Sequence, residues 1–156
     1  MAETRLHDVI DALVTLSTAA FDPASVLVSD GYPVTSSDGA MTVLSIGVDD
    51  PADELRADSG EATQEFANAA GRSRNEAGTV RCAITTGDGD GVPKTARDAA
   101  FDVLESVAAI VRGTSTPLNL PNVWKAGVTD VRLYQDQTEN GAAALLMFTV
   151  TYAARV

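Results

Sequence analysis

The sequence predicts an α+β domain in which two helices pack on a mostly antiparallel sheet, with the element order α-β-β-β-β-α-β-β. Apolar residues recur at helical spacing in two segments, one near the N-terminus and one in the second half of the chain. Between and after these segments, alternating stretches follow one another directly, which is typical of neighbouring antiparallel strands. The 156 residues are interpreted as one domain, 1–156, long enough to bury a core without a disulfide or a metal.

The chain begins with a segment that predicts a helix over residues 4–19. Its apolar side chains fall at helical spacing: Leu6, Val9, Ile10, Leu13 and Leu16. Asp22-Pro23 ends this helix, because a residue that precedes proline disfavours the α conformation. A short strand is expected at 26–28, and the alternation in Met41–Val48 predicts a second strand with one strongly apolar face.

Residues 49–61 carry six acidic side chains and one arginine. Such a charge run is usually solvated, so a loop or a short frayed helix is expected, with a metal site as the alternative. Two strands are predicted next, over 62–70 and 78–86. The segment 70–78, which connects them, is expected to form a turn.

The second helix is predicted to begin at Pro93, a favourable first-turn residue, and to end at Gly113. Its apolar stripe consists of Ala100, Val103, Leu104, Val107, Ile110 and Val111. A strand that contains Val131 and Leu133 follows, and Asn140-Gly141 within residues 137–141 predicts a hairpin turn. The last strand is expected over 142–154.

This last strand is apolar on both sides. One face presents Leu146, Phe148, Val150 and Tyr152. The opposite face presents Leu145, Met147, Thr149 and Thr151. A sheet that helices cover on one side only should have a more polar outer face. Leu145 and Met147 are therefore predicted to contact another sheet or another subunit, although packing within the chain would give the same pattern.

The charge of the chain limits its partners. Lys and Arg number 11 against 22 Asp and Glu, a formal net charge of −11. Such a chain is poorly suited to wrap a nucleic-acid backbone or to dock on an anionic membrane, since both need clustered basic residues. The sequence also lacks a membrane-spanning apolar run and a signal-peptide pattern, and its one cysteine, Cys82, is expected to be a buried apolar residue. We expect the chain either to act in a reducing cytoplasm or to be assembled there.

No residue pattern indicates catalysis. His7, the one histidine, lies in the first predicted helix, and the sequence has no G-x-S-x-G motif whose serine a histidine would activate. Residues 87–91 alternate Gly and Asp, but Val92 and Pro93 occupy positions where a calcium loop needs an oxygen ligand and a glycine. P-loop, C-x-x-C, H-E-x-x-H and dinucleotide patterns are missing from the sequence. We therefore expect no catalytic residue, cofactor or metal, and the residues alone indicate no more than a soluble α+β domain that self-associates.

Besides Leu145 and Met147, four residues are candidates for contacts with another subunit or with a partner protein in an assembly. Arg72 and Arg74 precede Glu76 in the predicted turn, where they are either simply solvated or form an ion pair with another subunit. Trp124, the one tryptophan, either packs in the core or anchors a contact.

Short motifs in a fixed order also run along the whole chain. They are Asp22-Pro23, Val26-Leu27-Val28, Asp30-Gly31-Tyr32-Pro33, Gly47-Val48-Asp49, Gln64-Glu65-Phe66-Ala67, Gly71-Arg72-Ser73-Arg74-Asn75-Glu76, Gly87-Asp88, an Arg97-bearing helix, Phe148-Thr149-Val150 and Ala153-Ala154-Arg155. In this order and spacing the chain resembles tail terminator proteins of long-tailed bacteriophages, in the form found in phages of actinobacteria. One departure is that Ala77-Gly78 follows Glu76, where many relatives have an aromatic residue.

The resemblance implies a homohexameric ring in the virion, assembled in the host cytoplasm. Such a ring caps the tail tube, stops its polymerisation and joins the tail to the neck. Its partners would be other copies of the chain, the major tail tube protein and a neck or stopper protein, while DNA passes through the lumen without specific binding. Two alternatives stay open: another head–tail joining or minor tail protein, and a small enzyme or ligand-binding domain.

Overall fold

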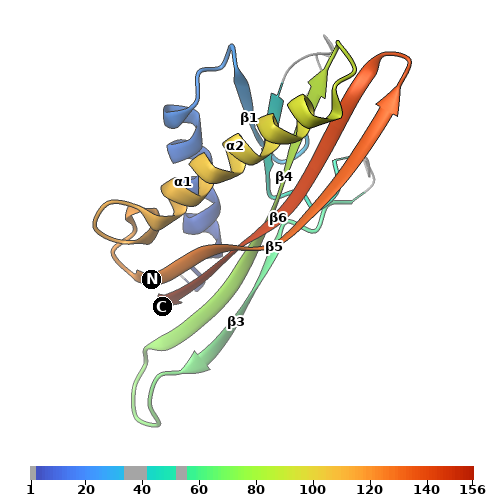
Figure 1. Ribbon diagram of the computed structural model, residues 1–156. Coiled ribbons are helices and arrows are strands. Elements are labelled where there is room, and N and C mark those ends of the chain that lie inside the picture. The colour runs from blue at the N-terminus through green and yellow to red at the C-terminus, as the bar shows by residue number, and fades with distance from the viewer. Residues whose placement is uncertain (1–2, 34–41, 52–55) are drawn as a thin grey trace.

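The computed structural model describes residues 3–33, 42–51 and 56–156, and it confirms the α+β class and the predicted element order. α1 (Leu6–Ala20) and α2 (Pro93–Arg112) lie on one side of a mostly antiparallel sheet (Figure 1). Its strands are β1 (Val26–Asp30), β2 (Thr42–Ile46), β3 (Gly60–Phe66), β4 (Arg74–Asp88), β5 (Val123–Thr138) and β6 (Gly141–Arg155). A short 3-10 helix, η1 (Pro117–Asn119), precedes β5.

β4 and β6 form the middle of the sheet. The strand order is β1-β2-β4-β6-β5, and β3 pairs with β4 next to β2. β4 therefore pairs with β6 along nearly its whole length, while its other side pairs first with β3 and then with β2. β1 and β2 are parallel, and the other described strand pairs are antiparallel.

The two helices begin and end close to the predicted positions. α1 starts at Leu6 and buries Val9 and Leu13 against the sheet. α2 starts at Pro93, as predicted, and the chain leaves it at Gly113, which has φ +66°. A Cβ atom at Gly113 would lie 2.0 Å from the carbonyl oxygen of Thr116, so both the conformation and the space require glycine there.

Several strand boundaries differ from the prediction. β3 ends at Phe66 rather than near residue 70, and β4 begins at Arg74 rather than 78, so the connection comprises residues 67–73 and the turn predicted over 70–78 was placed about four residues too far along the chain. β5 begins at Val123, before the expected strand. In the hairpin, Thr138 pairs with Gly141, which leaves Glu139 and Asn140 as the turn. Met41 and residues 52–55 of the acidic segment lie outside the described residues.

The core lies between the helices and one face of the sheet, which we call the helix face. Inward residues of the central strands are buried there: Val80, Cys82, Ile84, Leu146, Phe148, Val150 and Tyr152. From α2 they meet Ala96, Ala100, Val103, Val107 and Val111. Cys82 is 1% exposed, which confirms the prediction that it is a small buried residue. The opposite side, the open face, carries Leu145 and Met147.

Candidate functional site

The open face of the sheet is buried at some positions and partly exposed at neighbouring ones. Ala83 and Ser45, which pair with each other near the middle, are buried. Leu145 and Met147 are partly exposed, and Tyr134, which pairs with Leu145, is 52% exposed. The two residues predicted to contact another sheet or subunit therefore lie at the surface, and that contact stays a prediction.

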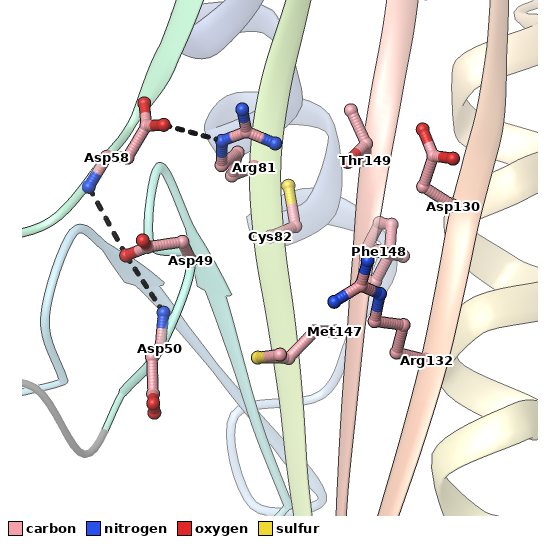
Figure 2. A pocket seen from close by; sticks show the side chains of 10 residues that line it. All are labelled: Asp49, Asp50, Asp58, Arg81, Cys82, Asp130, Arg132, Met147, Phe148 and Thr149. Atoms are coloured by element: carbon pink, nitrogen blue, oxygen red, sulfur yellow. Dashed lines mark hydrogen bonds and ion pairs between the residues drawn. The ribbon is translucent and has the colours of Figure 1, made fainter.

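A hollow of about 380 Å³ opens on this face between the loop after β2 and the strands β4, β6 and β5 (Figure 2). It is lined by Asp49, Asp50, Asp58, Arg81, Cys82, Asp130, Arg132, Met147, Phe148 and Thr149. Arg81 Nε donates to Asp58 Oδ2 at 2.8 Å, and this hydrogen bond raises the pKa of Arg81. Asp49 Oδ1 accepts hydrogen bonds from the backbone N–H groups of Asp50 and Asp58, which holds the loop at the rim.

The chemistry available in the hollow is ionic. Burial raises the pKa of the Cys82 thiol to about 12, so the thiol is protonated at neutral pH and is not a nucleophile. Arg132 extends toward Met147 and Phe148 (Figure 2). The described residues include no group of three or more His, Cys, Asp or Glu side chains that could hold a metal ion. The hollow could accept a charged or polar side chain of a partner.

Glu76 does not lie in a turn and is not at the surface. It is in β4, 1% exposed, and its carboxylate is bound within the chain. Oε1 accepts hydrogen bonds from Tyr152 Oη at 2.7 Å and from Arg5 N at 2.8 Å, and Oε2 accepts one from Gln64 Nε2 at 2.6 Å. The predicted role of Glu76 in an ion pair with another subunit is therefore inconsistent with its position.

These hydrogen bonds decide the ionisation of Glu76. Burial alone would raise its pKa, but the hydrogen bonds from Gln64, Tyr152, Thr4 and Arg5 outweigh burial and lower the pKa. The pKa of Tyr152 is raised by burial and by the neighbouring Glu76. Glu76 is therefore ionised and Tyr152 protonated at neutral pH. The cluster fastens the N-terminal segment to β3, β4 and β6.

Gly78 makes this cluster possible. A Cβ atom at Gly78 would lie 2.5 Å from the ring and the hydroxyl of Tyr152, which pairs with Gly78 in the neighbouring strand. The tyrosine ring crosses β4 above this glycine to reach Glu76. This hydrogen-bonded cluster around Glu76 was not identified from the sequence. Glu76 and Gly78 alternate along β4 with the same spacing as Val80 and Cys82, so they lie on the same, helix-facing side of the strand.

The other candidate residues lie at one end of the sheet. Arg72 is exposed in the turn between β3 and β4, whereas Arg74 forms an ion pair with Glu3 of the same chain at 3.0 Å. Trp124 is 53% exposed at an irregularity near the start of β5, so its interpretation as a core residue is wrong. Phe66, at the end of β3, is 74% exposed. Two large aromatic side chains thus lie exposed where β3 ends and β5 begins.

β3 and β5 both leave one edge without a neighbouring strand in the part of the chain that the structure describes. They lie on opposite sides of the sheet, because β3 pairs with β4 on the side away from β6, and β5 pairs with β6 on the side away from β4. An unpaired strand edge presents N–H and C=O groups that another strand can bind. Together with the open face, these edges are the candidate assembly surfaces.

Comparison with protein-family models and with curated proteins found no match for this chain. Neither described helix is long and apolar enough to cross a membrane.

Proposed function

We propose that this chain is a structural protein of a long-tailed bacteriophage that acts as a tail terminator. Six copies form a ring that caps the tail tube, ends its polymerisation and joins the tail to a neck or stopper protein. The observation that carries the proposal is that, among the described residues, one edge of β3 and one edge of β5 have no neighbouring strand, and these two edges lie on opposite sides of one sheet. The resemblance of the sequence to terminator proteins supplies the biological role.

Opposite edges suit a closed ring. When one surface of a subunit binds a different surface of the next copy, the interface is head-to-tail, and a suitable rotation closes it into a ring. Strand addition at a sheet edge is a common mode of protein association, because backbone groups supply the hydrogen bonds. A sheet with free edges on opposite sides can therefore be extended from copy to copy.

The net charge of −11 is compatible with a ring through which DNA passes. Acidic side chains near the lumen would repel phosphate groups and limit non-specific binding of DNA. The tube protein on one side and the neck protein on the other are the expected protein partners, with no cofactor.

A rival within the same class is another head–tail joining or minor tail protein. The rival from another class is a small enzyme or ligand-binding domain, for which the hollow beside Arg81 and Arg132 would be the site. Gene position separates these classes cheaply: a gene beside that of a major tail protein favours the tail, and a metabolic operon counts against it.

Cryo-electron microscopy of the virion that carries this chain is the direct test. We expect density for six copies in one ring at the junction between tail tube and neck, with a ring mass six times the 16.2 kDa of one chain. A different protein in that ring, or particles that lack this chain, would refute the terminator role.

A further inference from the structure

We propose that neighbouring copies of the chain join by antiparallel pairing of β3 in one copy with β5 in the next, in a register that places Glu65 opposite Lys125. The inference rests on the proposed ring and defines its subunit interface. In this register, residues 60–66 of one copy lie along residues 124–130 of the next in opposite directions. Strand direction, hydrogen-bonding groups, charge and segment length each support it.

Strand directions make the pairing antiparallel. β3 is antiparallel to β4, β4 to β6 and β6 to β5. β5 therefore runs parallel to β4 and opposite to β3. A rotation that places a second copy beside the first and keeps their strands aligned brings β5 against an antiparallel β3, the arrangement with the better hydrogen-bond geometry.

The outward hydrogen-bonding groups of β3 belong to its even-numbered residues. Ala67 N donates to Ser73 O, and Arg81 N donates to Ser59 O, so odd-numbered residues of this strand bond to β4. Hydrogen bonding alternates along an antiparallel ladder, and therefore Ala62 and Gln64 direct their N–H and C=O groups away from β4.

The outward groups of β5 follow from the same alternation. Arg74 and Val156 exchange both backbone hydrogen bonds, so even-numbered residues of the last strand bond to β4 and odd-numbered ones bond to β5. The β5 partners of these odd-numbered residues include Lys125 and Gly127. Ala126 and Val128, which lie on either side of Gly127, therefore direct their backbone groups outward.

The proposed register joins these outward groups pair by pair. Ala62 lies opposite Val128 and Gln64 lies opposite Ala126, so each pair can exchange two backbone hydrogen bonds. The side chains of Ala62 and Val128 both lie on the helix face, since they align with Gly78 and Val150 within their own chain. The helices of both copies consequently lie on the same side of the extended sheet.

The side chains on the open face are complementary in charge. Glu65 and Lys125 are both exposed, and neither forms an ion pair within the described part of the chain. Opposite charges directly across from each other stabilise an antiparallel pair.

At the end of the paired segment the register brings Phe66 of one copy beside Trp124 of the next, where the two exposed aromatic rings can cover each other.

Both paired segments end at backbone irregularities that lie opposite each other. β3 has 7 residues and begins at Gly60, where a Cβ atom would lie 2.3 Å from Thr79 O. In β5 the regular segment ends at Asp130, which has φ +53° in the register shift between Thr129 and Arg132. A shift of two residues would leave part of β3 unpaired or carry it past the bulge, and would separate Glu65 from Lys125. A shift of one residue would misalign the hydrogen bonds.

The bulge also has a geometric use in this arrangement. β1 lies one strand further out than β3, because it pairs with the far side of β2. The β1 of one copy would therefore meet the end of β5 in the next copy if both stayed in one plane. A bulge bends and twists a strand, so β5 beyond Asp130 can leave that plane.

Disulfide cross-linking of the full chain tests the register. Glu65 and Lys125 would form a non-hydrogen-bonded pair, with Cα atoms about 4.5 Å apart, within the range for a disulfide. The chain with both Glu65→Cys and Lys125→Cys is oxidised in concentrated solution and analysed on a non-reducing gel. We expect covalent multimers up to the closed ring, and dimers alone when the two single variants are mixed. Cys82 does not interfere, because it is buried and its pKa is about 12.

Pairs displaced by two residues are the matched controls. Thr63→Cys with Lys125→Cys, and Glu65→Cys with Gly127→Cys, place the two cysteines on diagonal neighbours whose Cα atoms lie about 7–8 Å apart, beyond the usual range for a disulfide, so we expect them to cross-link roughly fivefold more slowly or not at all. Equal cross-linking by a displaced pair, or none by the Glu65–Lys125 pair, would overturn the register. If cross-linking fails in this way but the virion still shows the ring, the register is wrong and the terminator role stands. If the pair cross-links but particles lack the chain, the terminator role fails and the interface stands.

Charge reversal gives a second measurement that needs no disulfide. Glu65→Lys and Lys125→Glu should each weaken self-association about two- to fivefold, as expected for like charges across a strand pair. The double variant restores the opposite charges and should recover the association of the original chain by sedimentation velocity. A double variant as weak as the product of the two single effects would contradict the pairing.

Discussion

The central strands and the edge strands of this sheet differ in how far their side chains are buried, although all of them belong to the same sheet. β4 and β6 have a strand on each side, and their inward side chains, such as Ile84 and Leu146, are fully buried. β3 and β5 have a strand on one side and carry exposed aromatic and charged side chains, such as Phe66 and Lys125. The difference indicates that the central strands stabilise the fold, and it is compatible with the proposal that the edge strands bind neighbouring copies.

The largest effect should come from the centre of β6, where two adjacent leucines point to opposite faces. Leu146 is 0% exposed against the helices, and Leu145 is partly exposed on the open face. Leu146→Ala removes buried methyl groups and leaves a cavity, so we expect a loss of about 2–5 kcal/mol in the free energy of unfolding. Leu145→Ala should cost less than about 1 kcal/mol.

Urea denaturation of the two variants measures this difference. Equal losses would mean that the open face is as important to the subunit as the core, and that it is covered within the chain. A small loss for Leu145→Ala together with weaker self-association would place this leucine at an interface instead.

A smaller loss in the free energy of unfolding is expected at Glu76, which lies in the central strand β4 and accepts a hydrogen bond from Gln64 in the edge strand β3. Glu76→Gln replaces a carboxylate that accepts hydrogen bonds from Tyr152 and from the Arg5 and Gln64 nitrogens, and it brings a second amide donor against them. Hydrogen bonds to a buried charged group contribute about 1.5–3 kcal/mol each, so we expect a loss of about that size in total after relaxation.

Glu76 should also make stability depend on pH. Its pKa is lowered in the folded chain, so its contribution is present above the ordinary glutamate pKa of 4.5 and is lost as the pH falls through the lower folded pKa. Unfolding free energies between pH 7 and pH 3 should fall less steeply for Glu76→Gln than for the original chain. Parallel pH profiles would exclude a lowered pKa at this residue.

The sequence predicted the elements that have a local pattern and missed those that depend on distant residues. The α2 start at Pro93 and its end at Gly113 are encoded locally, and both were predicted. The first residues of β4 lack apolar alternation because Glu76 occupies an inward position, and its partners lie far away at Arg5 and Tyr152. No pattern near Glu76 could show them.

Edge strands were hard to delimit for a related reason. β3 is partly or largely exposed along its length, so it has no buried alternation, and its predicted position was shifted toward residue 70. Trp124 looked like a core residue because it is large and apolar, but it lies at the start of an edge strand. The parallel pairing of β1 with β2 depends on topology, which alternation within either strand does not encode.

Two glycines, one in a central strand and one in an edge strand, allow the same substitution to be compared at both places. Gly78 lies in β4 below the ring of Tyr152, whereas Gly127 lies in β5 with no atom within 4 Å of an added Cβ among the described residues. Gly78→Ala should displace Tyr152 from Glu76 and cost about 1–3 kcal/mol, as overpacking does. Gly127→Ala should instead stabilise the subunit by about 0.4–1 kcal/mol, because alanine restricts the unfolded chain. Thermal unfolding at low protein concentration, where assembly does not contribute, compares them. A destabilised Gly127→Ala would show that the edge of β5 is already packed within the subunit, which would remove it as an assembly surface.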